Sequence, residues 1–578
     1  MSSFCDKVDQ ELAAIETSWQ KFLSHKWHYL ITLPGLLILL YVSYFIFCYS
    51  TTAYNVDASG GFRSVAAKNA FITIFTIIGF LGAGLLVYKI VRKTFSGRDL
   101  GRYGMIMGAL ALLCFGYYHT WNSDAYSHDY GYCGTGSHWY MIHSIYSSWT
   151  FPPVELYNQT YQPRLWHTSM AVFMRFNALF VHPSDVILFT KNGFSISVNE
   201  YVLLDMCRIA MAYCGILVVI MVPRIYAYLG LTGLYRGIAT FLTCLVPSTW
   251  YILYYRNNDG LAFFFEVSAL YFALLYYHKR DYVSVLLCAV AIGLGMETKL
   301  NAGLISLYVG GLFIYLFVRL LIDNKKHPER LKPHAIRTFL IQMVGFAIVV
   351  FPLGLGWAVY ANKTYGESIG YVMDLGHSKE ATGMFIDGSY YNPFLRYVAF
   401  PSPDLFFSIF NHRWMSEVNG VRVNHWGDLD FNCWTAYYKT ALFGEYDLSE
   451  TLTPLGATFS YLTYYLFIFI IMMTMVYSLV KFILLFRNRC AGFKGNHFLR
   501  YSVIVLLVIN GGAYAYFCYA YPVGCTQNAR YALPLIFPMI ALMSYALIDV
   551  PRFLGHLGEK KTVTPEPSHS LKSNSKIS

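Results

Sequence analysis

The segment from Thr338 to Tyr360 reads TFLIQMVGFAIVVFPLGLGWAVY and contains no charged residue. As a helix it would cross a hydrocarbon core of about 30 Å, which takes about 20 apolar residues. A basic segment, Lys325 to Arg337, precedes it, and a long polar segment that begins at Asn362 follows it. A basic loop, an apolar span and a polar loop, in this order, indicate a membrane helix with a defined orientation.

The rest of the chain repeats this pattern. Of its 578 residues, 56% are hydrophobic and only 13% are charged, whereas soluble domains carry roughly 25% charged residues. Apolar segments long enough to span a bilayer recur along the sequence and predict an all-α polytopic membrane protein with about twelve transmembrane helices. The expected spans are 30–49, 70–91, 104–119, 199–222, 237–255, 260–277, 282–298, 301–321, 338–360, 456–485, 500–520 and 531–548.

The basic loops set the orientation of these spans. If the spans alternate in direction, Lys89 to Arg102, His278 to Arg280, Lys325 to Arg337, Arg487 to Arg500 and the tail from Arg552 all lie on one side. The positive-inside rule makes this side the cytoplasm, and both termini then lie there. The basic residues behind the net charge of +11 therefore set the orientation of the spans in the membrane. Binding of nucleic acid is not expected.

This threading divides the chain into five expected parts. They are an N-terminal cytoplasmic helix with two extra spans (1–103), a catalytic membrane core (104–360) with an outer loop at 120–198, a mixed outer segment between the ninth and tenth spans (361–455), the C-terminal spans (456–550) and a disordered cytoplasmic tail (551–578). If the apolar stretch 166–181 crossed the membrane, the later basic loops would lie on the opposite side from the earlier ones. We expect it to lie in the outer interface, while a re-entrant or spanning placement stays open.

The cysteines show no spacing typical of a metal site, and most of them lie inside apolar segments. Cys133, Cys433 and Cys525 instead fall in expected outer loops. In an oxidising compartment two of these three could form a disulfide, and the sequence does not choose the pair.

An acidic residue beside a histidine marks the first outer loop as a candidate catalytic segment. His128 and Asp129, with Asp124 nearby, follow closely on an expected membrane helix. Asp129 is placed to accept a proton from an acceptor hydroxyl at the membrane surface, with His128 next to it. The alternative is that both residues cap or tether a surface loop.

Three cations stand at expected outer helix ends, where few other basic residues gather. Arg256, Lys299 and Arg530 would lie at the depth of a lipid phosphate. Arginine offers a planar fork to phosphate oxygens and lysine a point charge, so the three predict a phosphate site. The alternative is that they reach out to the interface or pair with Asp259 and Glu297.

Several short motifs occur in an order that resembles a known family. They are QPRLWH at Gln162 to His167, Asn258-Asp259 before three phenylalanines, GLGMETK at Gly293 to Lys299, YNPF at Tyr391 to Phe394, LFGE at Leu442 to Glu445, and Arg530-Tyr531 followed by Pro534. Together they resemble the membrane glycosyltransferases of the GT-C class, in particular the protein-O-mannosyltransferase-like and ArnT-like group. Arg164 stands where that group usually has a second proline, and His128 precedes the acid where the group usually has a glutamate after it.

The resemblance implies a GT-C fold with interfacial helices in the first outer loop. It also implies inverting transfer of a hexosyl or pentosyl group from a dolichyl- or undecaprenyl-phosphate donor to a protein, lipid or glycan acceptor. Asp129, assisted by His128, would be the base, and Lys299, Arg530 and Arg256 would bind the donor phosphate. Residues expected to support these groups or to contact the acceptor are Asp259, Asn258, His138, His167 and Asp124. No cofactor is required, and a divalent metal with unassigned ligands is left open.

The expected location is the endoplasmic reticulum or the cell membrane, with the site on the non-cytoplasmic side. Two other functions stay open. A transporter or flippase of a lipid or glycan would place its charges within the spans, facing a pathway. A non-catalytic subunit of a glycan-assembly complex would use the aromatic outer segment as a binding surface.

Overall fold

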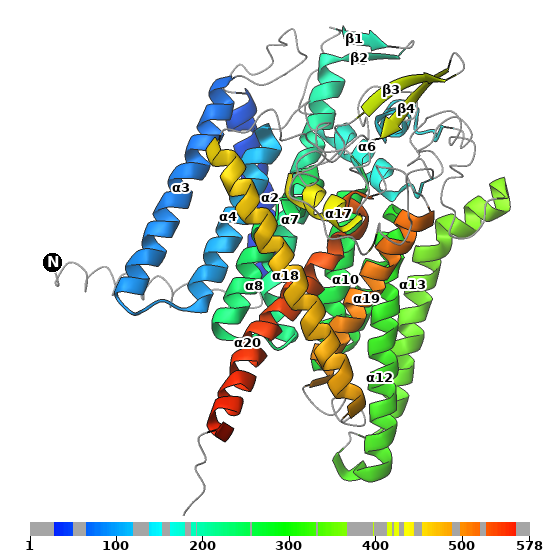
Figure 1. Ribbon diagram of the computed structural model, residues 1–578. Helices are drawn as coiled ribbons and strands as arrows, with labels where there is room; N and C mark the ends of the chain where they lie inside the picture. The colour runs from blue at the N-terminus through cyan, green and yellow to red at the C-terminus, as the bar shows by residue number, and fades with distance from the viewer. Residues whose placement is uncertain are drawn as a thin grey trace, which may run out of the picture.

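The protein is a bundle of long helices with small structured segments at one end (Figure 1). The computed structural model describes residues 28–49, 65–118, 138–152, 162–179, 187–191, 194–254, 257–330, 333–366, 397, 413–418, 421–426, 433–443, 454–487, 497–520 and 527–561. In chain order its elements are α2 (His28–Tyr49), α3 (Val65–Val91), α4 (Gly97–Tyr118), α5 (His138–Ser148), α6 (Leu165–Ala178), β1 (Ile187–Lys191), β2 (Phe194–Ser197), α7 (Val198–Tyr228), α8 (Gly233–Leu245), α9 (Ser248–Tyr254), α10 (Asp259–Lys279), α11 (Tyr282–Thr298), η3 (Leu300–Leu304), α12 (Ile305–Lys326), η4 (Pro328–Arg330), α13 (Ala335–Tyr365), β3 (Arg413–Val418), β4 (Val421–Trp426), α17 (Cys433–Phe443), α18 (Pro454–Arg487), α19 (His497–Ala520), η9 (Ala529–Leu535) and α20 (Ile536–Lys561).

The predicted all-α polytopic class is confirmed. Within the described residues, seven helical segments are long and apolar enough to cross a membrane. They are Thr73–Val91, Met206–Tyr228, Asp259–Lys279, Leu300–Lys326, Ala335–Tyr365, Phe498–Ala520 and Ala529–Asp549. Shorter apolar helices cover Thr32–Val42, Tyr282–Thr298 and Ile468–Leu484. The expected spans 104–119 and 237–255 are not among these segments and coincide with α4 and with α8 and α9. The total of about twelve crossings stays a prediction.

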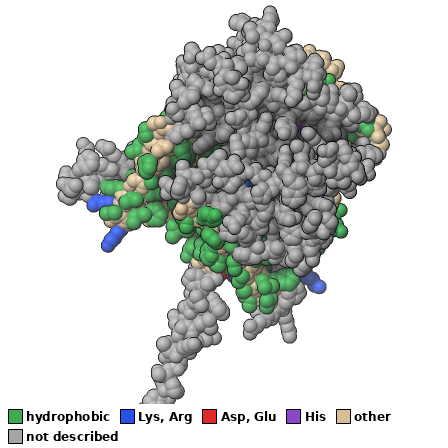
Figure 2. Space-filling view, turned by 45° about the horizontal axis from the view of Figure 1, so that its top comes forward, with side chains coloured by type: hydrophobic (Ala, Val, Ile, Leu, Met, Phe, Trp, Pro, Cys, Tyr) green, Lys and Arg blue, Asp and Glu red, His purple; other side chains and the backbone are tan. Residues whose placement is uncertain are grey.

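The two ends of the bundle differ in the way the basic loops predict. The antiparallel hairpins β1–β2 and β3–β4, together with α6 and α17, lie at one end, which is the top of Figure 1. We call this the hairpin end. The connections α3–α4 and α12–α13, the last residues of α18 and the first residues of α19 lie at the opposite end, the basic end (Figure 1). Figure 2 shows apolar side chains on the flanks of the bundle, with a few Lys and Arg side chains at its lower edges.

Close contact between α4 and α8 depends on glycines along one face of α4. A Cβ atom on Gly104 would lie 2.5 Å from Cα of Phe241, and one on Gly108 would lie 2.8 Å from the Cys244 carbonyl oxygen. Small residues at such spacings let two membrane helices approach to backbone contact. This contact brings the first residues of α4 and α8 together at the basic end.

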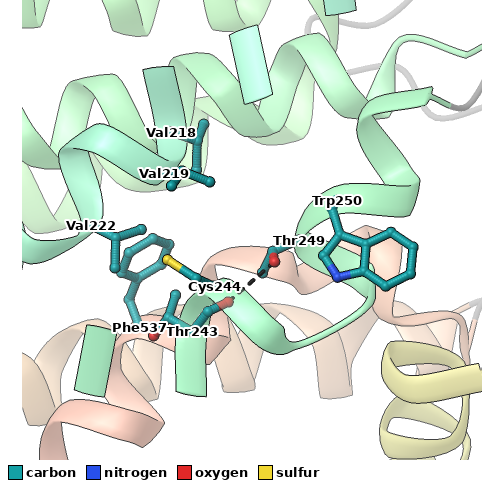
Figure 3. Close-up of a pocket in the computed structure, with 8 residues that line it drawn as sticks. All are labelled: Val218, Val219, Val222, Thr243, Cys244, Thr249, Trp250 and Phe537. Carbon is teal, nitrogen blue, oxygen red and sulfur yellow. Dashed lines mark hydrogen bonds between the residues drawn. The ribbon is translucent and has the colours of Figure 1, made fainter. Parts of the chain in front are cut away.

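The span predicted at 237–255 is interrupted in the structure. α8 ends at Leu245 and α9 begins at Ser248, because Pro247 between them has no N–H group for a continuous helix. Thr249 Oγ1 donates to the carbonyl oxygens of Val246 at 2.7 Å and Thr243 at 3.1 Å, which occupies acceptors that the break exposes. A small apolar cavity between α7, α8, α9 and α20 lies beside this break (Figure 3).

Residues 166–178 of the apolar stretch 166–181 lie in the 14-residue helix α6, and residues 180 and 181 lie outside the described residues. At 1.5 Å per residue such a helix is about 21 Å long, shorter than a hydrocarbon core of about 30 Å. It packs on α5 and α7 at the hairpin end (Figure 1). Near the C-terminus, α20 continues to Lys561, ten residues beyond position 551, where the tail was expected to begin.

Candidate functional site

The ends of three helical segments meet at one buried carboxylate. Asp259 is the first residue of α10, Lys299 lies between α11 and η3, and Arg530 lies in η9. Lys299 Nζ forms an ion pair with Asp259 Oδ1, and Arg530 Nε lies 3.8 Å from Asp259 Oδ2. The side chains of Asp259 and Arg530 are 3% exposed, whereas that of Lys299 is 19% exposed. We call Asp259, Lys299 and Arg530 the charge triad.

Irregular backbone next to each cation aims it at the carboxylate. Lys299 is extended, with φ −159° and ψ 126°, so the chain turns sharply between α11 and η3. Asn528 caps η9, and its Oδ1 accepts a hydrogen bond from Arg530 N at 2.9 Å. Within η9 the non-helical Ala532 and the following Pro534 keep this segment from joining α20 as one regular helix.

Two asparagines fix the start of α10. Asn257 Nδ2 donates to Asp259 Oδ2 at 2.9 Å, and Asn257 Oδ1 accepts from Asp259 N at 3.0 Å. Asn258 Nδ2 donates to Gln162 Oε1 at 2.6 Å and to the Thr298 carbonyl oxygen at 2.8 Å. Three of the motifs found in the sequence, around residues 162, 258 and 298, therefore meet at one place.

Tyr531 bridges the two cations. Its ring centroid lies 4.8 Å from Lys299 Nζ and 4.8 Å from Arg530 Cζ. Its hydroxyl oxygen accepts from Arg530 Nη2 at 2.9 Å. The sequence motif Arg530-Tyr531 contains this tyrosine, but no role was predicted for it. Its position next to Arg530 could have indicated one.

The triad keeps a net positive charge. The pairing with Asp259 that the sequence left open as an alternative is present for both Lys299 and Arg530. Glu297, the other acid considered, instead accepts a hydrogen bond from Trp357 N at 2.8 Å. Two cations thus share one carboxylate, in surroundings where charges are weakly screened. The remaining charge of +1 favours binding of an anion.

His138 and His167 form a buried pair at the hairpin end. His138 Nδ1 lies 2.8 Å from His167 Nε2, and the two residues are 2% and 0% exposed. Burial, followed by the neighbouring His138 and Arg164, holds the pKa of His167 well below its usual value of 6.5, although the Pro163 carbonyl raises it. His167 is therefore neutral near pH 7.

A metal does not fit between these two histidines. Two imidazole nitrogens bound to one tetrahedral zinc ion lie about 3.3 Å apart, as follows from metal–nitrogen distances of about 2.0–2.1 Å. The observed 2.8 Å matches a hydrogen bond. Among the described residues, no group of three His, Cys, Asp or Glu side chains is arranged to hold a metal ion.

Some predicted site residues lie outside the described residues. They are Asp124, His128, Asp129 and Arg256, and also Cys133 and Cys525. Their roles, including the base assigned to Asp129, stay predictions. Cys433 is buried on α17, and its pairing is not tested.

Sequence reasoning gave no role to two polar residues that are close to triad residues in the sequence, Gln527 and Asn301. Gln527 is 0% exposed, and among the described residues neither its side-chain nitrogen nor its side-chain oxygen has a hydrogen-bond partner. Asn301 Oδ1, two residues after Lys299, is also buried and has no partner in the described part of the chain. Buried polar groups are almost always hydrogen-bonded to protein, water or ligand. These amides therefore offer hydrogen-bonding groups that the described protein residues do not satisfy.

Charged residues also lie in or near the bundle without a sequence signal of function. Glu266, two turns farther along α10, interacts electrostatically with Asp259 and Lys299. Arg208 is 2% exposed within α7, and Lys439 is 0% exposed on α17, which packs against η9. Their positions depend on tertiary packing, which the sequence pattern does not show.

Comparisons with known proteins give one structural likeness. No protein-family model matches the chain, and no curated protein matches it. The chain is similar to the crystal structure of ArnT from Cupriavidus metallidurans bound to undecaprenyl phosphate, with 13% sequence identity over 80% of each chain and a TM-score of 0.28. A TM-score this low means that the two helix arrangements are only loosely alike.

Proposed function

We propose that this protein is a glycosyltransferase that moves a sugar from a polyprenyl-phosphate donor to an acceptor on the non-cytoplasmic side of the membrane. The charge triad at the hairpin end is the observation that supports this most strongly. Its three residues come from the motifs whose order resembles the GT-C class. The basic loops at the opposite end support a non-cytoplasmic position for the hairpin end under the positive-inside rule.

The donor phosphate would bind on the accessible side of the triad. Lys299 is the member with the most exposed side chain, at 19%, while Arg530 is 3% exposed. A phosphodiester carries one negative charge, which matches the net charge of the triad. The polyprenyl tail would remain in the lipid between helices, and the orphaned amides of Gln527 and Asn301 would face polar parts of the donor.

The reaction forms a bond between an acceptor oxygen and the anomeric carbon, and breaks the bond from that carbon to the phosphate oxygen. The electron pair of the broken bond goes to the phosphate, whose growing charge Lys299 and Arg530 stabilise. The acceptor proton goes to a base in the first outer loop, for which Asp129 is our candidate. Attack from the face opposite the phosphate inverts the anomeric configuration.

A flippase for a lipid-linked sugar is the second candidate, because two described ionisable residues lie within spans. Glu266 lies in α10 and Arg208 in α7, and intramembrane charges commonly line transport pathways. A flippase moves the intact donor lipid, whereas a transferase releases free polyprenyl phosphate. Appearance of that product separates the two functions.

The test uses the full chain, purified and reconstituted in vesicles. Binding is measured with undecaprenyl phosphate and dolichyl phosphate, which are the leaving groups and require no knowledge of the sugar. Transfer is measured as release of these lipids from a panel of polyprenyl-phosphate sugars. The variants are Lys299→Gln and Arg530→Gln, and the matched control is Lys363→Gln, which removes an exposed cation at the hairpin-end terminus of α13.

We expect each triad variant to weaken lipid-phosphate binding by about ten- to a hundredfold, the effect of losing one charge-assisted hydrogen bond. Lys363→Gln should bind as the wild type does. Equal binding by all variants would exclude the triad as the phosphate site. Donor lipid that crosses the bilayer without release of polyprenyl phosphate would favour the flippase.

A further inference from the structure

A second cationic site lies at the basic end of the bundle, opposite the charge triad. The first turns of α4 and α8, with the residues just before them, line an open hollow of about 440 Å³. Its lining residues are Ser96, Gly97, Arg98, Thr232, Gly233 and Arg236. We call it the arginine hollow. It shares no residue with the proposed transferase site.

The side chains of the two arginines of the hollow have no compensating acid among the described residues. Within that part of the chain, neither the Arg98 nor the Arg236 guanidinium group forms a hydrogen bond or an ion pair. The nearby Asp99 is already occupied, because it accepts from Lys89 Nζ at 2.6 Å and from Ser96 N and Oγ at 2.8 Å each. The first turn of α8 contains no acidic residue.

Glycine contacts hold the two sides of the hollow together. Gly97 and Gly237 are in backbone contact, and a Cβ atom on Gly97 would overlap the Gly233 backbone. The first turns of α4 and α8, each carrying one of the arginines, are thus fixed next to one another. Free N–H groups at the helix starts add to the positive potential. The Thr232 hydroxyl, which makes no capping hydrogen bond, is also available.

Basic residues are common at a cytoplasmic membrane surface, where they set orientation. Several other basic residues at this end are nevertheless neutralised by acidic side chains. Arg319 lies 3.6 Å from Asp323, while Lys481 and Arg500 lie 2.8 Å and 3.0 Å from Asp549. Arg98 and Arg236 differ because they line one hollow and have no acidic partner among the described residues.

We propose that the arginine hollow binds a phosphate group at the membrane surface. Two guanidinium forks and a hydroxyl match the donors that phosphate oxygens require. Two sources supply this chemistry at that depth: the headgroup of an anionic phospholipid and a soluble phosphate compound. The site holds either through the same two arginines.

The test measures thermal unfolding and lipid retention of the purified full chain in detergent. Three additives are compared: dioleoylphosphatidic acid, dioleoylphosphatidylcholine and inorganic phosphate. The test variant is Arg98→Gln/Arg236→Gln. The matched control is Lys325→Gln/Lys326→Gln, which removes the same charge from the exposed last turn of α12 at the same end.

We expect phosphatidic acid to raise the unfolding temperature of the wild type and the control more than phosphatidylcholine does. The affinity of the double-arginine variant for it should fall by about tenfold or more, as expected for loss of charged hydrogen bonds. Protection by inorganic phosphate alone, lost in the same variant, would identify a soluble ligand. Equal losses in both variants, or no protection by any phosphate, would overturn the proposal. If the double variant misfolds, Arg98→Gln and Arg236→Gln are measured singly, and each should give a partial loss.

Discussion

Replacement of Asp259 by asparagine tests the charge triad most directly. Asp259→Asn keeps the size of the side chain but removes the charge that Lys299 and Arg530 share, at a site where the carboxylate is 3% exposed. Breaking a buried ion pair by removing one partner destabilises proteins by about 3–5 kcal/mol, because the other charge stays buried. We expect a loss of this size in the free energy of unfolding.

Removal of one cation should destabilise the protein less than removal of the shared carboxylate. In Lys299→Gln the carboxylate still has Arg530, at 3.8 Å, and the amide of Asn257, at 2.9 Å. The loss should then be smaller, about 1–3 kcal/mol. A net charge of +2 in Asp259→Asn should also attract a phosphate more strongly, by about 3 kcal/mol for one added charge at about 5 Å and an effective dielectric constant of about 20.

The assay is thermal unfolding in detergent, with and without undecaprenyl phosphate. Asp323→Asn is the control, since its ion pair with Arg319 is 3.6 Å long between side chains that are 40% and 46% exposed. Exposed pairs contribute about 0–1 kcal/mol. Asp259 does not balance the two cations as described here if Asp259→Asn unfolds like the wild type or if Lys299→Gln is the more damaging change. The same holds if undecaprenyl phosphate protects Asp259→Asn less than the wild type.

Three further changes probe other parts of the structure. Gln527→Met removes two buried polar atoms that lack partners among the described residues. The free energy of unfolding should therefore rise by about 1–3 kcal/mol, with a higher unfolding temperature, while sugar transfer falls. A lower unfolding temperature would contradict this. Gly104→Ala should destabilise by about 1–3 kcal/mol through overpacking, whereas Gly84→Ala, with nothing within 4 Å of its Cβ, should not. Because folding holds the pKa of His167 low, the unfolded chain takes up the proton first, and wild-type stability should fall as pH drops below about 6.5. His167→Gln should flatten this dependence, and an unchanged slope would exclude His167 as its source.

The sequence predicted the membrane class because apolar segments and basic loops act locally and repeat. It also placed Asp259, Lys299 and Arg530 on one side, since each stands at the end of an apolar run. It did not predict the break at Pro247, because the high hydropathy on both sides was given more weight than the proline. Nor could it find Gln527, whose significance lies in burial without a partner, a property of tertiary packing alone.

The contacts of Asp259 indicate a role in positioning and not in proton transfer. One of its oxygens is paired with Lys299, and the other accepts from Asn257 and lies beside Arg530. Both oxygens are thus occupied by groups of the protein, and neither is placed to receive a proton from an acceptor hydroxyl. The base is therefore expected elsewhere, and Asp129 in the first outer loop is the predicted one.

The two acids should therefore behave differently in the transfer reaction. Asp129→Asn should abolish release of polyprenyl phosphate and leave binding of undecaprenyl phosphate intact, because only the proton acceptor is lost. Asp259→Asn should alter binding and keep the pH dependence of whatever transfer remains. Unchanged turnover in Asp129→Asn, or a pH profile that moves with Asp259→Asn, would assign the base to Asp259 instead.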